Sequence, residues 1–378
     1  METIPVMRPM LPAAERLATY LNRIDEARVY SNFGSLAVSL EERIAAHFGL
    51  SAGTVTTVAN GTLGLWLALL AQAVRPGTLC VLPAWTFVAS VHAATMAGLT
   101  PFFVDVDART GTIEPEAIRE MILSAPAEVG AVMPVAPFGQ SVDIAAWDKF
   151  RGNTGLPVVI DAAAGFDSLT PGETPIVVSL HATKVLGAGE GGFVITTDRS
   201  MVRTTRARSN FGFQGTREAR SSGGNAKLSE YHAAVGLASL DEWPQARPQW
   251  MAAADAYRMQ LLQSERVCFQ QGFGQSWISS TCVVNLGEAA ARVEAALDQA
   301  QIATRRWWGD GAHIHTATRA FPRTVLPVTE RLAKTTISLP FFRDIGSEQI
   351  EKIGKIVLTA LKVNDLASVR SRPCRPAR

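Results

Sequence analysis

The chain has 378 residues, of which 47% are hydrophobic, and its formal net charge is +2. This length and apolar content suffice for a large domain with a well-buried core and a smaller second domain. No run of basic residues is dense enough to follow a phosphate backbone, which argues against nucleic-acid binding. The terminal run 370–378, with four arginines and two prolines, is typical of a solvated chain end.

The four cysteines, Cys80, Cys268, Cys282 and Cys374, form no CxxC pair, so we expect neither a metal site nor a disulfide framework. A reducing, cytoplasmic compartment is the expectation from this cysteine usage. The N-terminus lacks a charged region followed by a long apolar run, and no uncharged apolar stretch of about 18 residues follows. We therefore expect no signal peptide and no membrane span.

Short apolar stretches alternate with helical patterns through the first part of the chain. The patterns predict strands at 55–59, 79–82, 101–104, 132–135 and 158–160, and helices at 35–48, 63–74, 87–96, 115–123 and 144–151. This alternation predicts parallel βαβ units, with helices on both faces of one sheet.

The alternation changes after Asp161. The patterns there predict successive strands at 176–180 and 192–197, a helix at 199–208, a long loop at 211–224, and separate helices at 228–240 and 245–262, the latter after Pro244. From about residue 250 they predict strands at 282–286 and 335–338 and helices at 289–299 and 347–361. We therefore predict a large α/β domain over 1–250, including the N-terminal segment, and a small C-terminal α+β domain over 251–378.

Asp161 and Lys184 form the most specific chemical pattern. Asp161 ends an apolar strand, at the edge where open α/β sheets bind ligands. Lys184 follows Thr183 and precedes the glycine-rich run 187–192. A carboxylate for a protonated pyridine nitrogen and an amine that forms an imine are what pyridoxal phosphate (PLP) requires. Taken alone, Asp161 would indicate a helix cap and Lys184 a solvated surface charge. The two in this order predict a PLP site in which both residues are catalytic.

Three weaker features accompany this pair. Gly61 and Thr62 open a helix after the first strand, where backbone N–H groups and a hydroxyl can hold a phosphate, although Asn-Gly is also an ordinary turn. Trp85 follows the next strand and is either a ring that stacks on a pyridine or plain core packing. Asn225 precedes a helix, where an asparagine is usually a cap.

Together these segments resemble the DegT/StrS-type nucleotide-sugar aminotransferases, over about residues 32–342. The similar segments are Asn32-Phe33-Gly34, Asn60-Gly61-Thr62, Pro83-Ala84-Trp85-Thr86-Phe87, 102–107, Phe138-Gly139-Gln140, 160–163, 179–192, Asn225 with Ser229-Glu230, 304–308 and Leu339-Pro340. The resemblance implies an α/β protein of PLP fold type I, like aspartate aminotransferase. Such a fold has a large, mostly parallel sheet sandwiched by helices, and a smaller α+β C-terminal domain.

The resemblance also implies roles for single residues. Lys184 would form the Schiff base, Asp161 would pair with the ring nitrogen, and Trp85 would stack on the ring. The further cofactor contacts that it implies are Gly61, Thr62, Ala163, Ser179 and, from the other subunit, Asn225. It therefore implies a homodimer with shared active sites.

Two departures from the family pattern stand out. Members usually carry Gln three residues after the aspartate, near the ring hydroxyl, where this chain has Ala164. A histidine usual before Phe138-Gly139 is absent from the segment 135–138. Both changes point to a subgroup with its own substrate pocket. The family also contains dehydratases in which His replaces the lysine, so Lys184 favours transamination.

The reaction implied is transfer of an amino group from glutamate to a nucleotide-linked keto-sugar, with a dTDP-4-keto-6-deoxyhexose favoured, in amino-sugar biosynthesis such as that of O-antigen polysaccharide. The residues predicted on the substrate side are Asn32, Phe33, His181, Glu190, Arg305, Trp307, Trp308 and His313, with Lys227 and His315 as weaker members. Arginine forks match phosphate oxygens. Glu190 could instead be a loop carboxylate facing water, and His313 a solvated loop histidine. The alternative functions are a PLP-dependent sugar dehydratase or epimerase, and a regulatory relative without catalysis.

Overall fold

One mixed sheet forms the centre of the larger part of the molecule in the computed structural model, which describes residues 3–362. Its strands lie in the order β3 (Thr100–Val104), β2 (Leu79–Pro83), β4 (Val129–Val132), β5 (Ile160–Asp161), β6 (Ile176–Ser179), β7 (Gly192–Ile195) and β1 (Val55–Val58). Parallel bridges at Val132–Val158 and Val135–Asp161 join β4 to β5. Only β7 pairs antiparallel with its neighbours, β6 and β1, so the predicted, mostly parallel sheet is confirmed.

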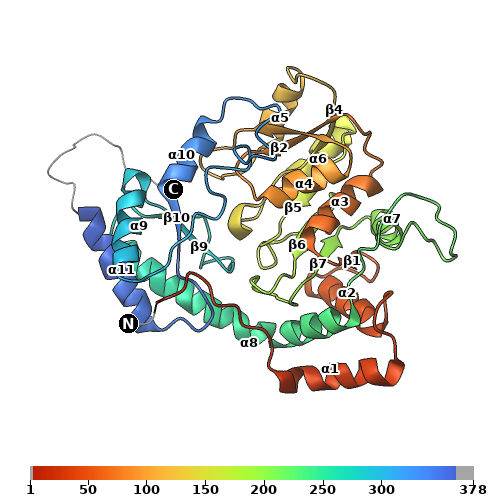
Figure 1. Cartoon of the computed structure of the whole chain (residues 1–378), viewed down its shortest axis with the longest axis horizontal. Coiled ribbons are helices and arrows are strands. Elements are labelled where there is room, and N and C mark those ends of the chain that lie inside the picture. The colour runs from red at the N-terminus through yellow and green to blue at the C-terminus, as the bar shows by residue number, and fades with distance from the viewer. Residues whose placement is uncertain (1–2, 363–378) are drawn as a thin grey trace.

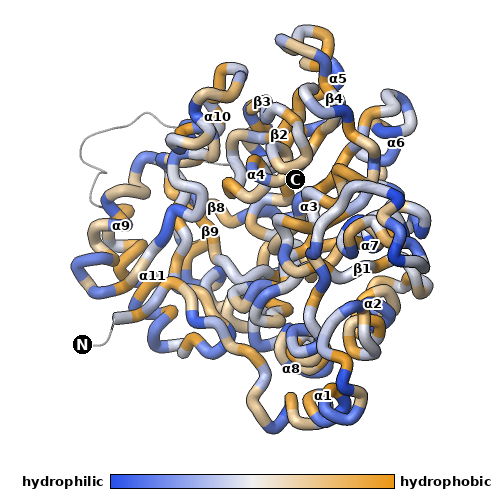
Figure 2. The backbone as a smooth tube through the Cα atoms, turned by 45° about the vertical axis from the view of Figure 1, so that its right-hand side comes forward, coloured by the Kyte–Doolittle hydropathy of each residue, from blue (hydrophilic) through white to orange (hydrophobic). Residues whose placement is uncertain are grey.

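Helices cover both faces of this sheet because alternate strand residues point to opposite sides. On one face, Cys80 and Leu82 of β2 pack in a cluster with α3 (Gly61–Ala71) and α4 (Val88–Met96). On the other face, Val81 packs in a cluster with α2, α5, α6 and the long helix α8 (Glu230–Leu261). The bounds of the remaining helices of this part are α2 (Ser35–His47), α5 (Pro115–Ile122), α6 (Ile144–Thr154) and α7 (Arg199–Ser209). In Figure 2 the centre of the molecule is mostly hydrophobic, and hydrophilic stretches lie on the outer helices.

A smaller C-terminal part contains an antiparallel sheet with the strand order β10-β9-β8. Its elements are β8 (Cys268–Phe269), β9 (Cys282–Asn285), α9 (Ala290–Gln299), α10 (Pro327–Thr335), β10 (Thr336–Leu339) and α11 (Ser347–Lys362). The N-terminal segment reaches this part, because Ile4 bridges to Ile302 and Val6 accepts a hydrogen bond from the amide of Phe341.

The prediction of two helices on either side of Pro244 is wrong. One helix, α8 (Glu230–Leu261), runs through Pro244 and Pro248 and connects the two parts of the molecule (Figure 1). Both prolines are exposed, whereas the opposite side of the helix is buried at residues such as Trp243 and Trp250. Burial of that side outweighs the loss of the hydrogen bonds that the prolines cannot make. Since α8 crosses residue 250, the predicted domain boundary there lies inside a helix and stays a prediction.

The other elements largely follow the sequence patterns. β4 begins and ends earlier than predicted, at Val129–Val132, and the residues after it make isolated bridges. Helices α1 (Ala14–Ala27) and α10 had not been predicted. No helix within residues 3–362 is long and apolar enough to cross a bilayer. The basic run 370–378 lies outside the described residues.

Candidate active site

Asp161 ends β5 at the carboxyl edge of the sheet, where it is only 5% exposed. Its Oδ2 accepts a hydrogen bond from Ser90 Oγ at 2.6 Å, and its Oδ1 accepts one from the amide of Ala163 at 3.1 Å. Burial raises the pKa of the Asp161 carboxyl, while Ser90, Ala163 and the charge of Lys184 act against that rise. The site therefore holds a buried carboxylate with a donor on each oxygen.

Lys184 lies in the turn after β6, and its amide donates to the carbonyl of His181 at 2.8 Å. Burial lowers the pKa of the Lys184 amine, and the charge of Asp161 opposes this change. The structure thus places the two residues predicted as catalytic within electrostatic reach of each other. An amine with a lowered pKa is neutral more often and is a better nucleophile and proton acceptor.

The residues predicted to bind a phosphate lie at the start of α3. Asn60 caps this helix by accepting from the amide of Leu63 at 2.9 Å. A Cβ on Gly61 would lie 3.4 Å from the Cβ of Ser179, so the backbone of Gly61 approaches the end of β6 closely. Gly61, Thr62 and Ser179 are therefore brought together where the helix dipole favours an anion.

Trp85 belongs to an aromatic cluster at the end of β2. Its ring meets those of Phe138 and Trp308 edge-on, with centroid separations of 6.1 Å and 5.2 Å. Phe138 and Trp308 stack on each other at 4.0 Å. Trp85 is 4% exposed, so much of its surface is core packing, and its stacking on a cofactor ring stays a prediction.

Asn225 is exposed, and its Oδ1 accepts from Lys227 Nζ at 2.6 Å. The carbonyl of the next residue, Ala226, accepts from the amide of Ala59, just before the turn that opens α3. Asn225 therefore lies near the predicted phosphate-binding turn of its own chain. Its predicted contribution to a partner's site stays a prediction.

The residues predicted on the substrate side fall into separate groups. His181 Nδ1 lies 2.9 Å from Thr183 Oγ1, and its Nε2 lies 3.7 Å from a carboxylate oxygen of Glu190, which is exposed. Arg305 lies over the ring of Trp307 at 4.9 Å. Among these residues, Trp308 is the one that reaches the cluster around Trp85.

Asn32 and Phe33 form a turn before α2, and both have left-handed backbone conformations, with φ of 64° and 59°. The guanidinium of Arg206 lies 3.7 Å from the centre of the Phe33 ring. Glu230 accepts from the amides of Leu36 and Ala37 at 2.8 Å and 3.0 Å and so fixes the start of α2, directly after the turn. Strained turns of this kind are enriched at functional sites.

His313 is not a solvated histidine, because it is 5% exposed and burial lowers its pKa. Its Nδ1 is buried without a hydrogen-bond partner in the described part of the chain. His315, in contrast, is exposed. An unpaired buried ring nitrogen is costly, which keeps His313 a candidate for contact with a bound molecule.

Sequence reasoning missed Ser90 and Thr86. Thr86 directly follows Trp85, and Ser90 lies four residues later in the first turn of α4, but this spacing alone does not show that the two hydroxyls meet each other and Asp161. Ala164 stands where the family's Gln would be, and its carbonyl lies 2.8 Å from where a Cβ on Gly139 would stand. The loop after β5 is therefore packed closely against the loop after β4.

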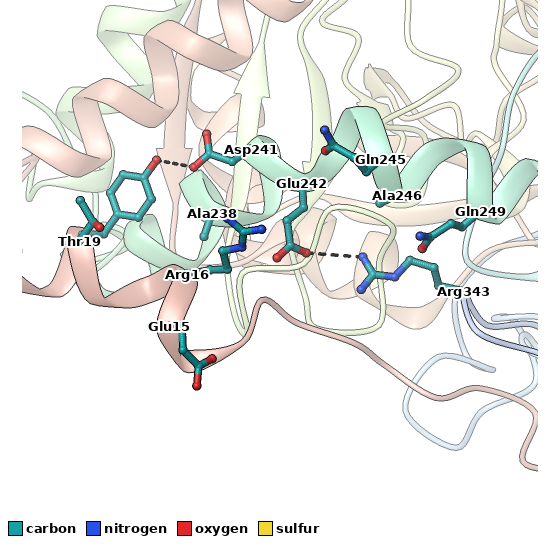
Figure 3. Close-up of a pocket in the computed structure, with 11 residues that line it drawn as sticks. Glu15, Arg16, Thr19, Ala238, Asp241, Glu242, Gln245, Ala246, Gln249 and Arg343 are labelled. Atoms are coloured by element: carbon teal, nitrogen blue, oxygen red, sulfur yellow. Dashed lines mark hydrogen bonds and ion pairs between the residues drawn. The ribbon is translucent and has the colours of Figure 1, made fainter.

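A separate polar cavity of about 590 Å³ lies between α1 and α8 (Figure 3). It contains none of the residues predicted at the site. Within it, Tyr20 donates to Asp241 at 2.6 Å, and Arg343 lies 3.6 Å from Glu242. Two of its carboxylates, Asp241 and Glu242, are therefore already paired.

Comparison with known proteins identifies the family. The chain is 32% identical to a dTDP-4-amino-4,6-dideoxy-D-glucose transaminase of Shigella dysenteriae over 263 residues, which cover 68% of this chain and 70% of that protein. The structure resembles a Bacillus cereus protein assigned as a PLP-dependent aminotransferase (TM-score 0.88, 28% identity, 94% of this chain and 100% of that one). It also resembles DesI, solved with its TDP-sugar product (TM-score 0.85, 30% identity, 96% of this chain and 94% of that one).

The residues gathered at the sheet edge fit PLP, the cofactor of such aminotransferases. They supply an anion for a ring nitrogen, an amine with a lowered pKa, and a helix N-terminus for a phosphate. The model of the DegT/DnrJ/EryC1/StrS aminotransferase family matches residues 13–358. The protein is a member of the DegT/DnrJ/EryC1/StrS aminotransferase family.

Proposed function

We propose that the protein transfers an amino group from glutamate to the keto carbon of a nucleotide-linked sugar, with a dTDP-4-keto-6-deoxyhexose as the favoured acceptor. The observation that carries the proposal is the pairing of the buried carboxylate of Asp161 with the half-buried Lys184, whose charges act on each other at the sheet edge. The choice of sugar is supported by the similarity to the Shigella transaminase, which is named for a dTDP-sugar, and to DesI, which was solved with its TDP-sugar product.

In this proposal different residues hold different parts of the cofactor. Gly61, Thr62 and Ser179 hold the phosphate, Trp85 covers one face of the ring, and Asp161 accepts a hydrogen bond from the ring nitrogen. Bound PLP supplies the electron sink that makes the proton on the amine-bearing carbon removable.

Lys184 is the proposed proton carrier. Its neutral amine takes the proton from the carbon that bears the amine and returns it at the next step. Glutamate leaves as the 2-oxo acid, and in the second half of the cycle the C=O of the sugar becomes CH–NH₂. The lowered pKa of Lys184 favours this role because more of the amine is neutral near neutral pH.

The substrate side is proposed to include Trp308, which contacts the cluster around Trp85, and His313, whose Nδ1 lacks a partner among the described residues. Arg305 is proposed to meet the diphosphate. Asn32, Phe33, His181, Glu190 and Trp307 stay in the proposal as contacts to the sugar or nucleotide.

We also propose a homodimer in which Asn225 completes the site of the partner subunit. Exposed aromatic residues near the site support this, since Phe87 is 56% exposed and Phe211 is 45% exposed. Aromatic residues are enriched at the buried centres of protein–protein interfaces.

The test has two stages. The first mixes enzyme, PLP and glutamate and measures 2-oxoglutarate and the aminated cofactor. The second adds a panel of dTDP-, UDP- and GDP-linked keto-sugars and measures amino-sugar formation by mass spectrometry. Amination of the dTDP-4-keto-6-deoxyhexose supports the proposal. Amine transfer to the cofactor without amination of any sugar overturns the acceptor class, and no transfer in the first stage overturns transamination from glutamate.

A further inference from the structure

A chain of buried hydroxyls ends on Asp161. Ser90 lies in the first turn of α4, and Thr86 lies in the loop between β2 and α4, directly after Trp85. Thr86 Oγ1 lies 2.8 Å from Ser90 Oγ, and Ser90 Oγ lies 2.6 Å from Asp161 Oδ2. Thr86, Ser90 and Asp161 are 1%, 0% and 5% exposed, so bulk water does not compete for these bonds.

The direction of the chain follows from counting hydrogens. An ionised carboxylate only accepts, and each hydroxyl carries one hydrogen. Ser90 therefore donates to Asp161, and Thr86 donates to Ser90. The other acceptor near the Thr86 hydroxyl, the carbonyl of Phe87, is farther away at 3.4 Å. The chain thus has one preferred direction, and it points toward the anion.

The need for such donors comes from burial. A carboxylate taken out of water is disfavoured as the anion unless hydrogen bonds or an opposite charge compensate. At Asp161 the compensating groups are the Ser90 hydroxyl, the Ala163 amide and the charge of Lys184. Among residues 3–362, Lys184 is the charged side chain that acts on the Asp161 carboxylate. Because the charge of Lys184 varies with pH, only the Ser90 hydroxyl and the Ala163 amide stabilise the anion at every pH.

We propose that Ser90, supported by Thr86, is a positioning residue that holds the Asp161 carboxylate as an anion and in one orientation toward the ring nitrogen of the cofactor. This inference rests on the proposed role of Asp161. Through Thr86, which adjoins Trp85 in sequence, the same chain connects the residue that covers the ring to the residue that holds its nitrogen. Loss of the Ser90 hydroxyl should therefore change the acidity of Asp161 and the affinity for PLP.

The experiment compares Ser90→Ala, Ser90→Thr and Thr86→Val with wild type. The first readout is the protonation midpoint of Asp161 in the apoprotein, followed by infrared difference spectroscopy, with Asp161→Asn assigning the band. The second readout is the dissociation constant for PLP. Ser209→Ala is the matched control, because Ser209 is also 0% exposed but its hydroxyl donates to the carbonyl of Arg206.

We expect Ser90→Ala to raise the midpoint by about one pH unit or more, as loss of a hydrogen bond to a charged group implies. PLP affinity should fall at least several-fold. Ser90→Thr should restore both values, Thr86→Val should shift both in the same direction by less, and Ser209→Ala should change neither. If Ser90→Ala does not fold, the shift in Thr86→Val decides the matter.

An unchanged midpoint in folded Ser90→Ala, or a shifted midpoint with unchanged PLP affinity, would overturn the inference. These outcomes are distinguishable from failure of the proposed function. If the proposed function fails, wild type itself does not bind PLP or does not take the amine from glutamate.

Discussion

The ring of Phe138 stacks on the indole of Trp308 with centroids 4.0 Å apart and an angle of 22° between planes. Phe138 follows β4 in the large part of the molecule, whereas Trp308 lies between α9 and α10 in the C-terminal part. Both rings meet Trp85 edge-on. The stack therefore connects the C-terminal part to the residue proposed to cover the cofactor.

Replacing Trp308 by Leu should weaken PLP binding. The variant loses a stacked pair and an edge-on contact, each of which contributes about 0.5–1.5 kcal/mol, so we expect a loss of affinity of about tenfold. Equilibrium dialysis of the apoprotein with PLP measures it. Trp307→Leu is the control for cofactor affinity, because the Trp307 ring contacts Arg305 instead. An equal loss in both variants would contradict the role of the stack.

Mixing two inactive variants tests the shared site. Lys184→Ala and Asn225→Ala subunits, unfolded and refolded together, should form mixed dimers with one intact site if Asn225 serves the partner subunit. Random pairing then restores about a quarter of the wild-type activity, because half the dimers are mixed and each has one good site. If Asn225 serves its own chain, the mixture stays as inactive as its components.

The ion pair between the buried Glu41 and the half-buried Arg206 should be important for stability. Arg206 lies 2.5 Å from a carboxylate oxygen of Glu41, whose side chain is 8% exposed and also accepts from Thr57. Arg206→Ala leaves this carboxylate without its cation, so we expect the free energy of unfolding to fall by about 3 kcal/mol. Urea denaturation measures this, and adding Glu41→Gln should recover part of the loss.

The pH dependence of this loss has a definite sign. Burial raises the pKa of Glu41, and Arg206 opposes that rise. Without Arg206, the folded pKa lies further above the unfolded value, so the native state holds the proton in the window between them. Stability of Arg206→Ala should therefore fall as pH rises through that window. A deficit that does not shrink toward acid pH would contradict this reading.

Lys184 should give the opposite sign in the apoprotein. Because burial lowers its pKa in the folded state, the unfolded state binds the proton more readily between the two values. At neutral pH this difference lowers the free energy of unfolding. The free energy should rise again as pH rises toward the unfolded pKa of Lys184, near 10.4. We expect Lys184→Met to unfold at higher urea concentration than wild type at pH 7, with the difference narrowing as pH rises. A difference independent of pH would contradict a lowered pKa of Lys184 in the folded state.

The sequence was most informative where chemistry and periodicity coincide. The run to Asp161, the turn at Gly61 and the loop of Lys184 are local patterns, and the sheet that brings them together follows from the βαβ rhythm. Ser90 was not predictable in the same way, because its role depends on the fold bringing the first turn of α4 to the end of β5, where Ser90 meets Asp161. The continuity of α8 through Pro244 also depends on burial on both sides of the proline, which local propensity does not show.

The most direct test of the account is to find the lysine that holds the cofactor. Wild type loaded with PLP is reduced with borohydride, digested, and mapped by mass spectrometry. We expect the label on Lys184, with no visible absorbance of bound cofactor in Lys184→Ala. A label on another lysine, such as Lys227, or an unchanged absorbance in Lys184→Ala would contradict it.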